Sequence, residues 1–546
     1  MATRAFVFCA IDIYPFEGGI YSFFASNGSS QVLSCNVSQT LDSGGSFSIT
    51  LAPGGPNGIA ASPSWSEVLT PMSFVVIAMQ REDHSNVVML GVITNIEESQ
   101  TWSANNVIRT ITVTGFDFFY FFNHFSWNSL SFMAGNALNV IGSTINNTAL
   151  GYILNYGFSD TPQALANKFY NFIMLNPNGI MGKTAIPYQG KNIFIGDALG
   201  AFIDPYPNTH IVPSATNFMS EDSTWANKFQ RILPFPIYEW FVATGPLNTW
   251  GTIQSGGLAF TSTLLPQAVA ATPQMVGRIN PQPILEVNPN NSGYYSPAIT
   301  GTVNDNLFTA LNTYQIENQG FISSNIQFGV NGVKNFYIIN PLGLNLLFGG
   351  NKANSSIYSM TYPLIADPAS IHRYGFSPYS FTTEWLNDST VIQPVQSDTE
   401  IADIVIDMNT RISSYCEPLP LMANATVTME LRPDIFPGNT FQYNPFVQQA
   451  NNLWLFYIES VSHNYVFGGP STTTLQLSRG LPVTVYADQN LMSNILIGNA
   501  QRLNGQYVSG LPSGVGAPLV GYTVSNGGQT QILADIGKFY VTPQPQ

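Results

Sequence analysis

The sequence predicts a β-rich α+β protein with two antiparallel β-barrels and a mixed helical and loop region between them. Residues 1–125 and 311–495 contain short runs in which apolar and polar residues alternate, the period expected for half-buried strands. Both ends also show the same order of a Pro-Gly loop, a strand set, and an apolar strand followed by an alternating one. Residues 126–310 differ, because apolar residues recur there at helical spacing between loop-rich stretches.

The first barrel, residues 1–125, is predicted from four strand-like runs. In GSFSITL, residues 45–51, large apolar side chains alternate with Ser and Thr. A charged turn at 81–84 and a polar linker at 97–106 separate the later runs, which lie at 73–79, 87–96 and 107–119. Short strands divided by turn signals are typical of a small antiparallel barrel or sandwich.

The connecting region, residues 126–310, is expected to contain helices and loops. Residues 136–145, 161–174 and 223–233 have helical spacing, and prolines at 234 and 236 end the last of these. The stretch 245–304 is rich in Gly, Pro, Ser, Thr and Asn, which predicts loops and short strands.

The second barrel, residues 311–495, is predicted to contain an inserted irregular segment at 346–398 and a helix at 402–416. Residues 496–546 are Gly-rich with weak patterning, and we expect them to form a C-terminal extension onto a neighbouring subunit. The strands of this barrel are expected at 314–328, 334–341, 425–431 and 439–443, and in a hairpin at 453–481.

The composition indicates an ordered chain with a polar but largely uncharged surface. Charged residues make up 9% of the 546 residues, against about 25% in an average soluble protein, and aromatic residues make up 13%. Interface cores lose charge and gain aromatic side chains, so this composition favours a protein that buries much of its surface against partners. An extracellular β-rich protein with a coat of Asn, Ser and Thr is the alternative.

Charge and hydropathy exclude two kinds of partner. The net charge is −14 and no Lys/Arg cluster is present, which argues against nucleic acid as a main partner. No run of about 18 apolar residues occurs, so no membrane insertion is expected. The first residues lack the pattern of a signal peptide, because Asp12 interrupts a short apolar stretch.

The three cysteines, Cys9, Cys35 and Cys416, form neither a disulfide framework nor a set of metal ligands. We expect buried free thiols. The sequence does not decide whether Cys9 and Cys35 form a disulfide bond.

The sequence predicts no catalytic, cofactor-binding or metal-binding residues. It contains no G-x-S-x-G elbow, no H-E-x-x-H motif and no phosphate loop, and its five histidines are scattered. The acidic pairs Glu97/Glu98 and Glu221/Asp222 lie in predicted turns or loops. Asp117 lies in an aromatic run, where a carboxylate needs a hydrogen-bond or charge partner.

Glu459 and His463 are the remaining candidates for acid/base chemistry. Four residues of extended strand separate them by about 13 Å, so they do not touch without a bend. Residues of equal parity share one face of a strand, which predicts that Tyr457, Glu459, Val461 and His463 line one face. We interpret that face as a polar seam toward a neighbouring subunit.

The hairpin sequence YIESVSHNYVFGGPSTTTLQLSRG, residues 457–480, resembles a late segment of the baseplate hub proteins of phage contractile tails. These hubs are related to the hub half of VgrG-type spikes. In the family, a Tyr-Ile-Glu-x-Val-x-His strand turns through a glycine pair into a Thr-x-Leu-x-Leu-x-Arg-Gly strand. The fingerprint positions of this motif are occupied here by Tyr457, Glu459, His463, Arg479 and Gly480.

Other segments resemble the family in the expected order. LRPDIFPGNTFQY at 431–443 is similar to its Pro-Gly segment before the barrel, and the strands within 40–125 are similar to its first barrel. RYGFSP at 373–378 departs from the pattern, because Phe376 or Ser377 stands where arginine is common.

The resemblance implies a structural virion protein, the central hub of the tail baseplate, without enzymatic activity. Three copies, each giving two tube-like barrels, would form a pseudo-hexameric ring that adapts the six-fold tail tube to the three-fold spike. The implied partners are further copies of the chain, the tail spike protein, tail tube or tube-initiator proteins, and a tape measure protein. DNA would pass through the channel without specific binding. The implied location is the baseplate of the virion, assembled in the host cytoplasm.

Two alternatives remain open at this point. A cell-wall hydrolase at the tail tip would need a carboxylate pair or a metal site. A β-rich receptor-binding tail protein would show repeats or a long fibrous region.

Overall fold

The computed structural model describes part of the chain. The described residues are 7–15, 21–24, 31–55, 63–82, 84–103, 106–124, 126–127, 185–188, 191–194, 223–243, 274–281, 311–316, 320–330, 332–341, 365–366, 368–383, 412, 415–416, 419–446, 453–483, 506–507 and 522–523. Within these ranges, no helix has the length and apolar character that a membrane crossing requires. The helices expected at 136–145 and 161–174 lie outside them, as do most residues of the expected helix at 402–416 and of the C-terminal extension.

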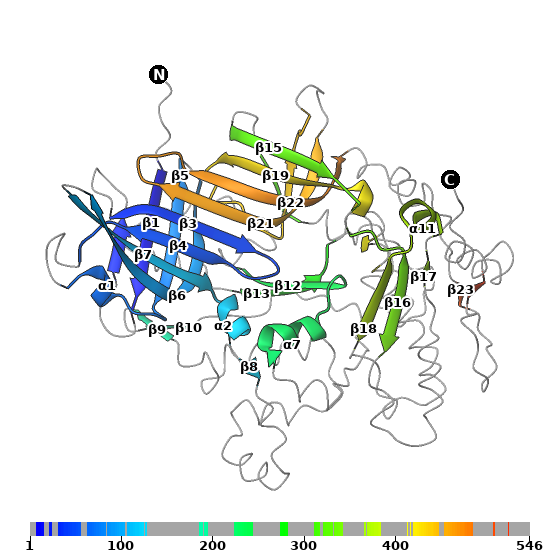
Figure 1. Ribbon diagram of the computed structural model, residues 1–546, viewed down its shortest axis with the longest axis horizontal. Coiled ribbons are helices and arrows are strands. Elements are labelled where there is room, and N and C mark those ends of the chain that lie inside the picture. Colours follow the sequence, from blue (N-terminus) through cyan, green and yellow to red (C-terminus); the bar gives the residue numbers. More distant parts are fainter. Residues whose placement is uncertain are drawn as a thin grey trace, which may run out of the picture.

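A thirteen-stranded sheet dominates the structure (Figure 1). Its strand order is β15-β19-β22-β21-β3-β4-β7-β6-β5-β1-β2, and β20 pairs with β21 and with β14. Its pairs are antiparallel except for the parallel pair β14–β20. The N-terminal strand set comprises β1 (Val7–Tyr14), β2 (Tyr21–Phe24), β3 (Val32–Thr40), β4 (Ser46–Leu51), β5 (Phe74–Arg81), β6 (His84–Ser103) and β7 (Asn106–Asp117). The C-terminal strand set comprises β14 (Thr313–Gln315), β15 (Phe321–Phe328), β19 (Ala423–Glu430), β20 (Thr440–Tyr443), β21 (Trp454–Val466) and β22 (Thr472–Pro482).

The long strand β21 joins the two strand sets. Along one edge, its first residues pair with β20 and its later residues pair with β3, where Val461 lies opposite Gln39 and Tyr465 opposite Cys35. The predicted β-rich class is therefore confirmed, and the two ends of the chain meet in one continuous sheet.

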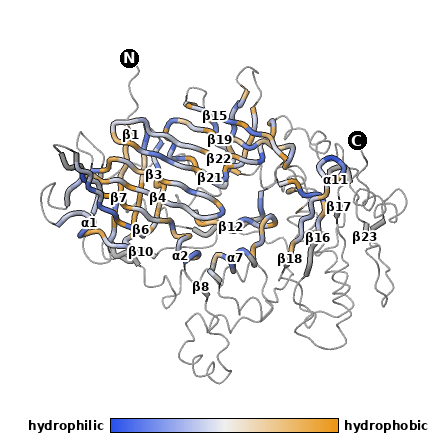
Figure 2. The backbone as a smooth tube through the Cα atoms, viewed as in Figure 1, coloured by the Kyte–Doolittle hydropathy of each residue, from blue (hydrophilic) through white to orange (hydrophobic). Residues whose placement is uncertain are grey.

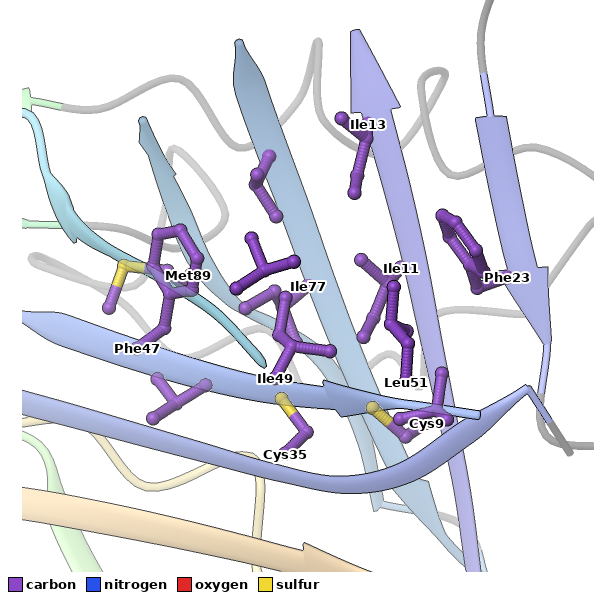
Figure 3. Packing of buried hydrophobic residues seen from close by; sticks show 14 of the residues in the cluster. Cys9, Ile11, Ile13, Phe23, Cys35, Phe47, Ile49, Leu51, Ile77 and Met89 are labelled. Atoms are coloured by element: carbon purple, nitrogen blue, oxygen red, sulfur yellow. The ribbon is translucent and has the colours of Figure 1, made fainter. Parts of the chain in front are cut away.

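Each strand set packs over a hydrophobic core of its own. Hydrophobic and hydrophilic residues alternate along the strands (Figure 2), and the buried positions follow the period of two that the sequence predicts. Burial of each Val, Leu or Ile contributes about 1.5–3 kcal/mol, so these cores are the main source of stability. The first core (Figure 3) also takes in Leu431 and Tyr465 from the C-terminal set. The second core includes Val427, Phe441, Phe456, Ile458, Val461, Leu475 and Leu477.

Shorter elements surround the sheet. Residues 223–233, predicted to be helical, contain α7 (Trp225–Ile232), which begins where the Thr224 hydroxyl accepts a hydrogen bond from the Asn227 N–H. The other helical elements are α1 (Trp65–Val68), α2 (Phe119–His124), α11 (Pro368–Tyr374) and the 3-10 helix η4 (Leu419–Leu421). The remaining strands are β8 (Ser126–Trp127), β9 (Ala185–Tyr188), β10 (Lys191–Phe194), β11 (Ser223–Thr224), β12 (Tyr238–Ala243), β13 (Gln274–Ile279), β16 (Phe336–Pro341), β17 (Ile365–Ala366), β18 (Pro378–Thr383), β23 (Gln506–Tyr507) and β24 (Tyr522–Thr523).

Two expectations about secondary structure are wrong. The polar linker expected at 97–106 is a two-stranded ribbon, because β6 and β7 continue their pairing to their ends at Ser103 and Asn106. Part of the segment expected to be irregular, 346–398, is regular, because β18 pairs in parallel with β16. The side chain of Asn335 fixes this pairing: its amide donates to the Gly375 carbonyl at 2.7 Å and its oxygen accepts from the Ser377 N–H at 2.8 Å.

Replacing Gly115 by Ala is expected to destabilise the first strand set by about 1–3 kcal/mol. A Cβ atom at this position of β7 would lie 2.0 Å from the Val92 carbonyl oxygen and 2.5 Å from the Phe47 ring. Urea denaturation measures the effect. The control Thr114→Ala alters the neighbouring half-buried residue and is expected to cost less than about 1 kcal/mol. Equal effects of the two substitutions would contradict the close packing at Gly115.

Candidate functional site at the junction of the strand sets

Two β-bulges place the fingerprint residues in the hairpin of β21 and β22. On β21, the register shifts between Ile458 and Ser460, so Glu459 is the extra residue of the first bulge. On β22, Arg479 and Gly480 lie in the second bulge, and Arg479 has a positive φ of 55°. Such a φ is uncommon for a residue with a side chain, which indicates that the surrounding contacts hold Arg479 in place.

Gly480 allows the backbone of β22 to lie directly against the ring of Phe456. A Cβ atom at Gly480 would lie 2.1 Å from the Cε1 atom of that ring. A larger residue would push the second bulge away from Phe456 and would displace the neighbouring Arg479. Steric contact with Phe456 therefore explains why the Arg-Gly motif has a glycine at this position.

Arg479 is a buried cation whose guanidinium is shared by distant segments. Its Nη2 donates to Glu459 Oε1 at 3.3 Å, and its Nη1 donates to Asn280 Oδ1 at 3.0 Å and to the Pro281 carbonyl. Its side chain is 2% exposed. Burial lowers the pKa of Arg479, but Glu459 and its other polar neighbours raise it above the usual value, so the group stays charged.

Aromatic rings and a second carboxylate complete the surroundings of Arg479. The guanidinium carbon lies 4.1 Å from the ring centre of Tyr457 and 5.2 Å from that of Tyr415. The Tyr457 hydroxyl donates to both carboxylate oxygens of Glu239, at 2.6 and 2.7 Å. Because Glu239 belongs to β12, this contact ties the region between the strand sets to the hairpin (Figure 1).

Carboxylates outnumber cations among these groups. Burial raises the pKa of Glu459, although Arg479 and a hydrogen bond from the Ser478 hydroxyl oppose this. Asp42 follows β3, and burial together with the charge of Glu239 raises its pKa as well. Both shifts favour the protonated carboxyl, so the site binds protons more readily than free carboxylates do.

A cavity of about 300 Å³ lies against this cluster. Asp42, Glu239, Glu459 and Arg479 supply its charged groups, and uncharged polar, aliphatic and aromatic side chains line the rest. Among the described residues, no group of three or more His, Cys, Asp or Glu side chains could hold a metal ion. The arrangement supplies hydrogen bonds and charge pairs that fix the hairpin relative to β12 and β13.

His463 lies apart from this cluster, and the prediction that it shares a face with Glu459 is wrong. The bulge at Glu459 inserts one residue, so the alternation of faces reverses there and Ile458 and Val461 both enter the second core. His463 is fully buried between β3 and β22, and its Nδ1 lies 2.9 Å from Thr473 Oγ1.

The predicted polar seam toward a neighbouring subunit is also wrong for Tyr457, Val461 and His463. All three are buried within the chain with an exposure of 0%, and the fingerprint residue Arg479 is 2% exposed. They stabilise the chain internally. Glu459 is half-buried beside the cavity.

Asp117, predicted to need a partner, has two. Its carboxylate accepts hydrogen bonds from the N–H groups of Gly45 and Phe119, which connects the β3–β4 turn to the start of α2. Burial raises its pKa to about 7, although both hydrogen bonds oppose this shift.

Sequence reasoning missed the partners that come from outside the hairpin: Asp42, Glu239, Asn280 and Tyr415. One signal could have revealed Glu239. It is a single carboxylate in the apolar run YEWFVA, residues 238–243, as Asp117 is in its aromatic run.

Comparisons with known proteins show similarity at the level of solved structures. No protein-family model matches the chain, and no curated protein matches it. A tail protein from Neisseria meningitidis is similar over 86% of this chain and 96% of its own, at 9% identity and a TM-score of 0.39. The 43 kDa tail protein of prophage MuSo2 from Shewanella oneidensis is similar over 86% and 98%, at 10% identity and a TM-score of 0.42. An E. coli type VI secretion component, described as similar to the T4 bacteriophage tail proteins gp27 and gp5, covers 83% and 73%, at 9% identity and a TM-score of 0.35.

Replacing Arg479 by Met is expected to destabilise the protein by about 2–3 kcal/mol, because the half-buried Glu459 and the buried Glu239 then lose their cation; the exposure of Glu459 keeps the loss below that of a fully buried pair. Urea denaturation measures this loss. Arg109→Met, at an exposed position of β7, is the matched control and is expected to change stability by less than about 0.5 kcal/mol. Adding Glu459→Gln to Arg479→Met should recover part of the loss. A double variant as unstable as the sum of its single variants would show that the two side chains are not coupled.

His463 is expected to make the protein acid-sensitive. Burial lowers its pKa to about 4, while nearby Asp434 opposes this shift. The unfolded chain binds a proton at about pH 6.5 and the folded chain does not, so stability is complete above pH 6.5 and falls as the pH drops to 4. The loss attributable to His463 is roughly 3 kcal/mol.

The pH dependence is tested by measuring the free energy of unfolding at pH 7 and pH 5. Acidification from pH 7 to pH 5 should cost the wild type and His372→Asn, which alters an exposed histidine, about 2 kcal/mol more than it costs His463→Asn. The raised pKa of Asp117 acts in the opposite sense, but equally in all three proteins. An unchanged cost of acidification in His463→Asn would refute the assignment.

Proposed function

We propose that this chain is a non-enzymatic structural tail protein, the central hub of a contractile-tail baseplate. The support for this proposal lies in the chain itself. The observation that carries it is the hairpin of β21 and β22: its family-like residues join the two strand sets and the region between them.

The continuous sheet suits a chain that supplies two similar modules to one ring. Each strand set has its own core, and β21 holds the two at a fixed spacing through its pairing with β3. In the proposed homotrimer, each set forms one tube-like barrel, and three copies give six modules in a closed ring. Such a ring matches a six-fold tail tube on one side and a three-fold spike on the other.

The charge of the chain supports a channel through which DNA passes without binding. The net charge is −14, and only 17 of the 546 residues are Lys or Arg, so phosphate groups find few counter-charges. The partners in this proposal are the spike protein, tail tube or tube-initiator proteins, and a tape measure protein. The location is the virion baseplate, after assembly in the host cytoplasm.

The outer edge of the sheet offers a surface for contact between copies. β15 pairs only with β19 among the described residues, and it exposes Ile322 and Phe328. The strand contains no charged residue. Uncharged, apolar edge strands are prone to pair with another chain, so we assign β15 to the contact between subunits.

Native mass spectrometry of the purified chain is expected to show trimers of the 59.5 kDa subunit, and electron microscopy should show rings. Ile322→Lys should shift the mass distribution toward monomers, because it places a charge at the sheet edge. Asn36→Lys adds the same charge to an exposed position of β3 inside the sheet and should leave the trimer intact.

Two results would count against the proposal. A monomer that persists at high protein concentration would exclude the self-assembling hub. Clearing of a peptidoglycan gel by the isolated chain would favour the cell-wall hydrolase instead.

A further inference from the structure

Two buried cysteines meet in the first core although their strands are not neighbours in the sheet. Cys9 belongs to β1 and Cys35 to β3, and four strands separate β1 from β3 in the sheet order. Both side chains are fully buried, and the thiols of Cys9 and Cys35 share a hydrogen bond. Figure 3 shows both side chains close together at one end of the core. Both cysteines are free thiols in this structure.

The position of the pair makes a covalent link between distant parts of the first strand set feasible. β1 lies next to β2 at one end of the sheet, whereas β3 lies at the seam with β21. A link between β1 and β3 connects the sheet end to the seam across the core.

We propose that Cys9 and Cys35 are a redox-active dithiol that low-molecular-weight disulfides oxidise to an intramolecular bridge. In the first step, the thiolate of one cysteine attacks a small disulfide, forms a mixed disulfide and releases one small thiol. In the second step, the other cysteine attacks the mixed disulfide, forms the Cys9–Cys35 bond and releases the second small thiol. The two protein thiols are oxidised, and one small disulfide is reduced to two thiols.

Burial controls when this reaction occurs. It raises the pKa of the Cys9 thiol well above the usual value, so little thiolate exists while the core is closed. Exchange therefore requires local opening, and the four-residue strand β2, which pairs only with β1 among the described residues, has few backbone pairs to break. The dithiol stays reduced in a reducing compartment and forms the bridge slowly in an oxidising one. This inference is independent of the proposed tail function.

The test incubates the full wild-type chain, without denaturant, with oxidised glutathione. The reaction is then stopped by alkylation with N-ethylmaleimide in denaturant. Trypsin does not separate the pair, because no Lys or Arg lies between Arg4 and Arg81. Cleavage after Glu17 places Cys9 and Cys35 on different peptides, so a bridge appears as one linked pair in the mass spectrum.

The expected result is a linked pair of peptides containing Cys9 and Cys35, with Cys416 still alkylated as an internal control. The bridge should raise the thermal midpoint by roughly 5–10 °C, since it constrains the unfolded chain. Cys35→Ser should give no linked peptide and no rise in the midpoint. The proposal is overturned if wild-type Cys9 and Cys35 both remain alkylated, if each carries a separate glutathione, or if the link forms with Cys416. Because the mapping uses the wild-type chain, it does not depend on the folding of the variant.

Discussion

The buried guanidinium of Arg479 is the interaction on which the arrangement of the described segments depends. Its partners come from β21, from the residues after β13, and from the aromatic ring of Tyr415 on a further segment. Taking an ion out of water costs several kcal/mol, and only a complete set of partners offsets that cost. The cluster is therefore stable with all segments in place and unstable when one is missing. An apolar junction of similar area would tolerate small shifts far better.

The bulge at Glu459 is needed because β21 contacts two different environments. Up to and including this bulge, Tyr457 and Glu459 face β12 and the cavity. After it, His463 and Tyr465 face the first core and the seam with β3. An unbroken period of two would place all four side chains on one face, and one of the two environments would lose its partners. The extra residue at Glu459 resolves this conflict.

The sequence was informative where one local rule decided the outcome. Alternation predicted the strands around Phe47 and Val427, and helical spacing with a proline stop predicted α7. Sequence patterning failed at the ribbon of β6 and β7, because the pairing of these two strands continues through a polar stretch that was expected to be a linker.

The site was predicted in part. The family-like motif drew attention to Glu459 and Arg479, but periodicity placed His463 on the wrong face. A bulge adds one residue and leaves no mark in composition, so a count along the strand cannot detect it. Glu239 and Asn280 lie about 200 residues from the hairpin, as the separations of 218 and 199 show. No local pattern links segments so far apart.

The junction of the strand sets stands out because charged residues gather there in a chain that has few of them. Only 9% of the residues are charged, yet Asp42, Glu239, Glu459 and Arg479 line one cavity. Buried charges contribute little to solubility, but their hydrogen bonds have fixed directions, which apolar contacts lack. In the proposed ring, each copy must present its two strand sets at the same spacing, because any error in one copy repeats in every other and prevents closure. A directional, charge-paired junction inside each chain meets that requirement before any subunit contact forms.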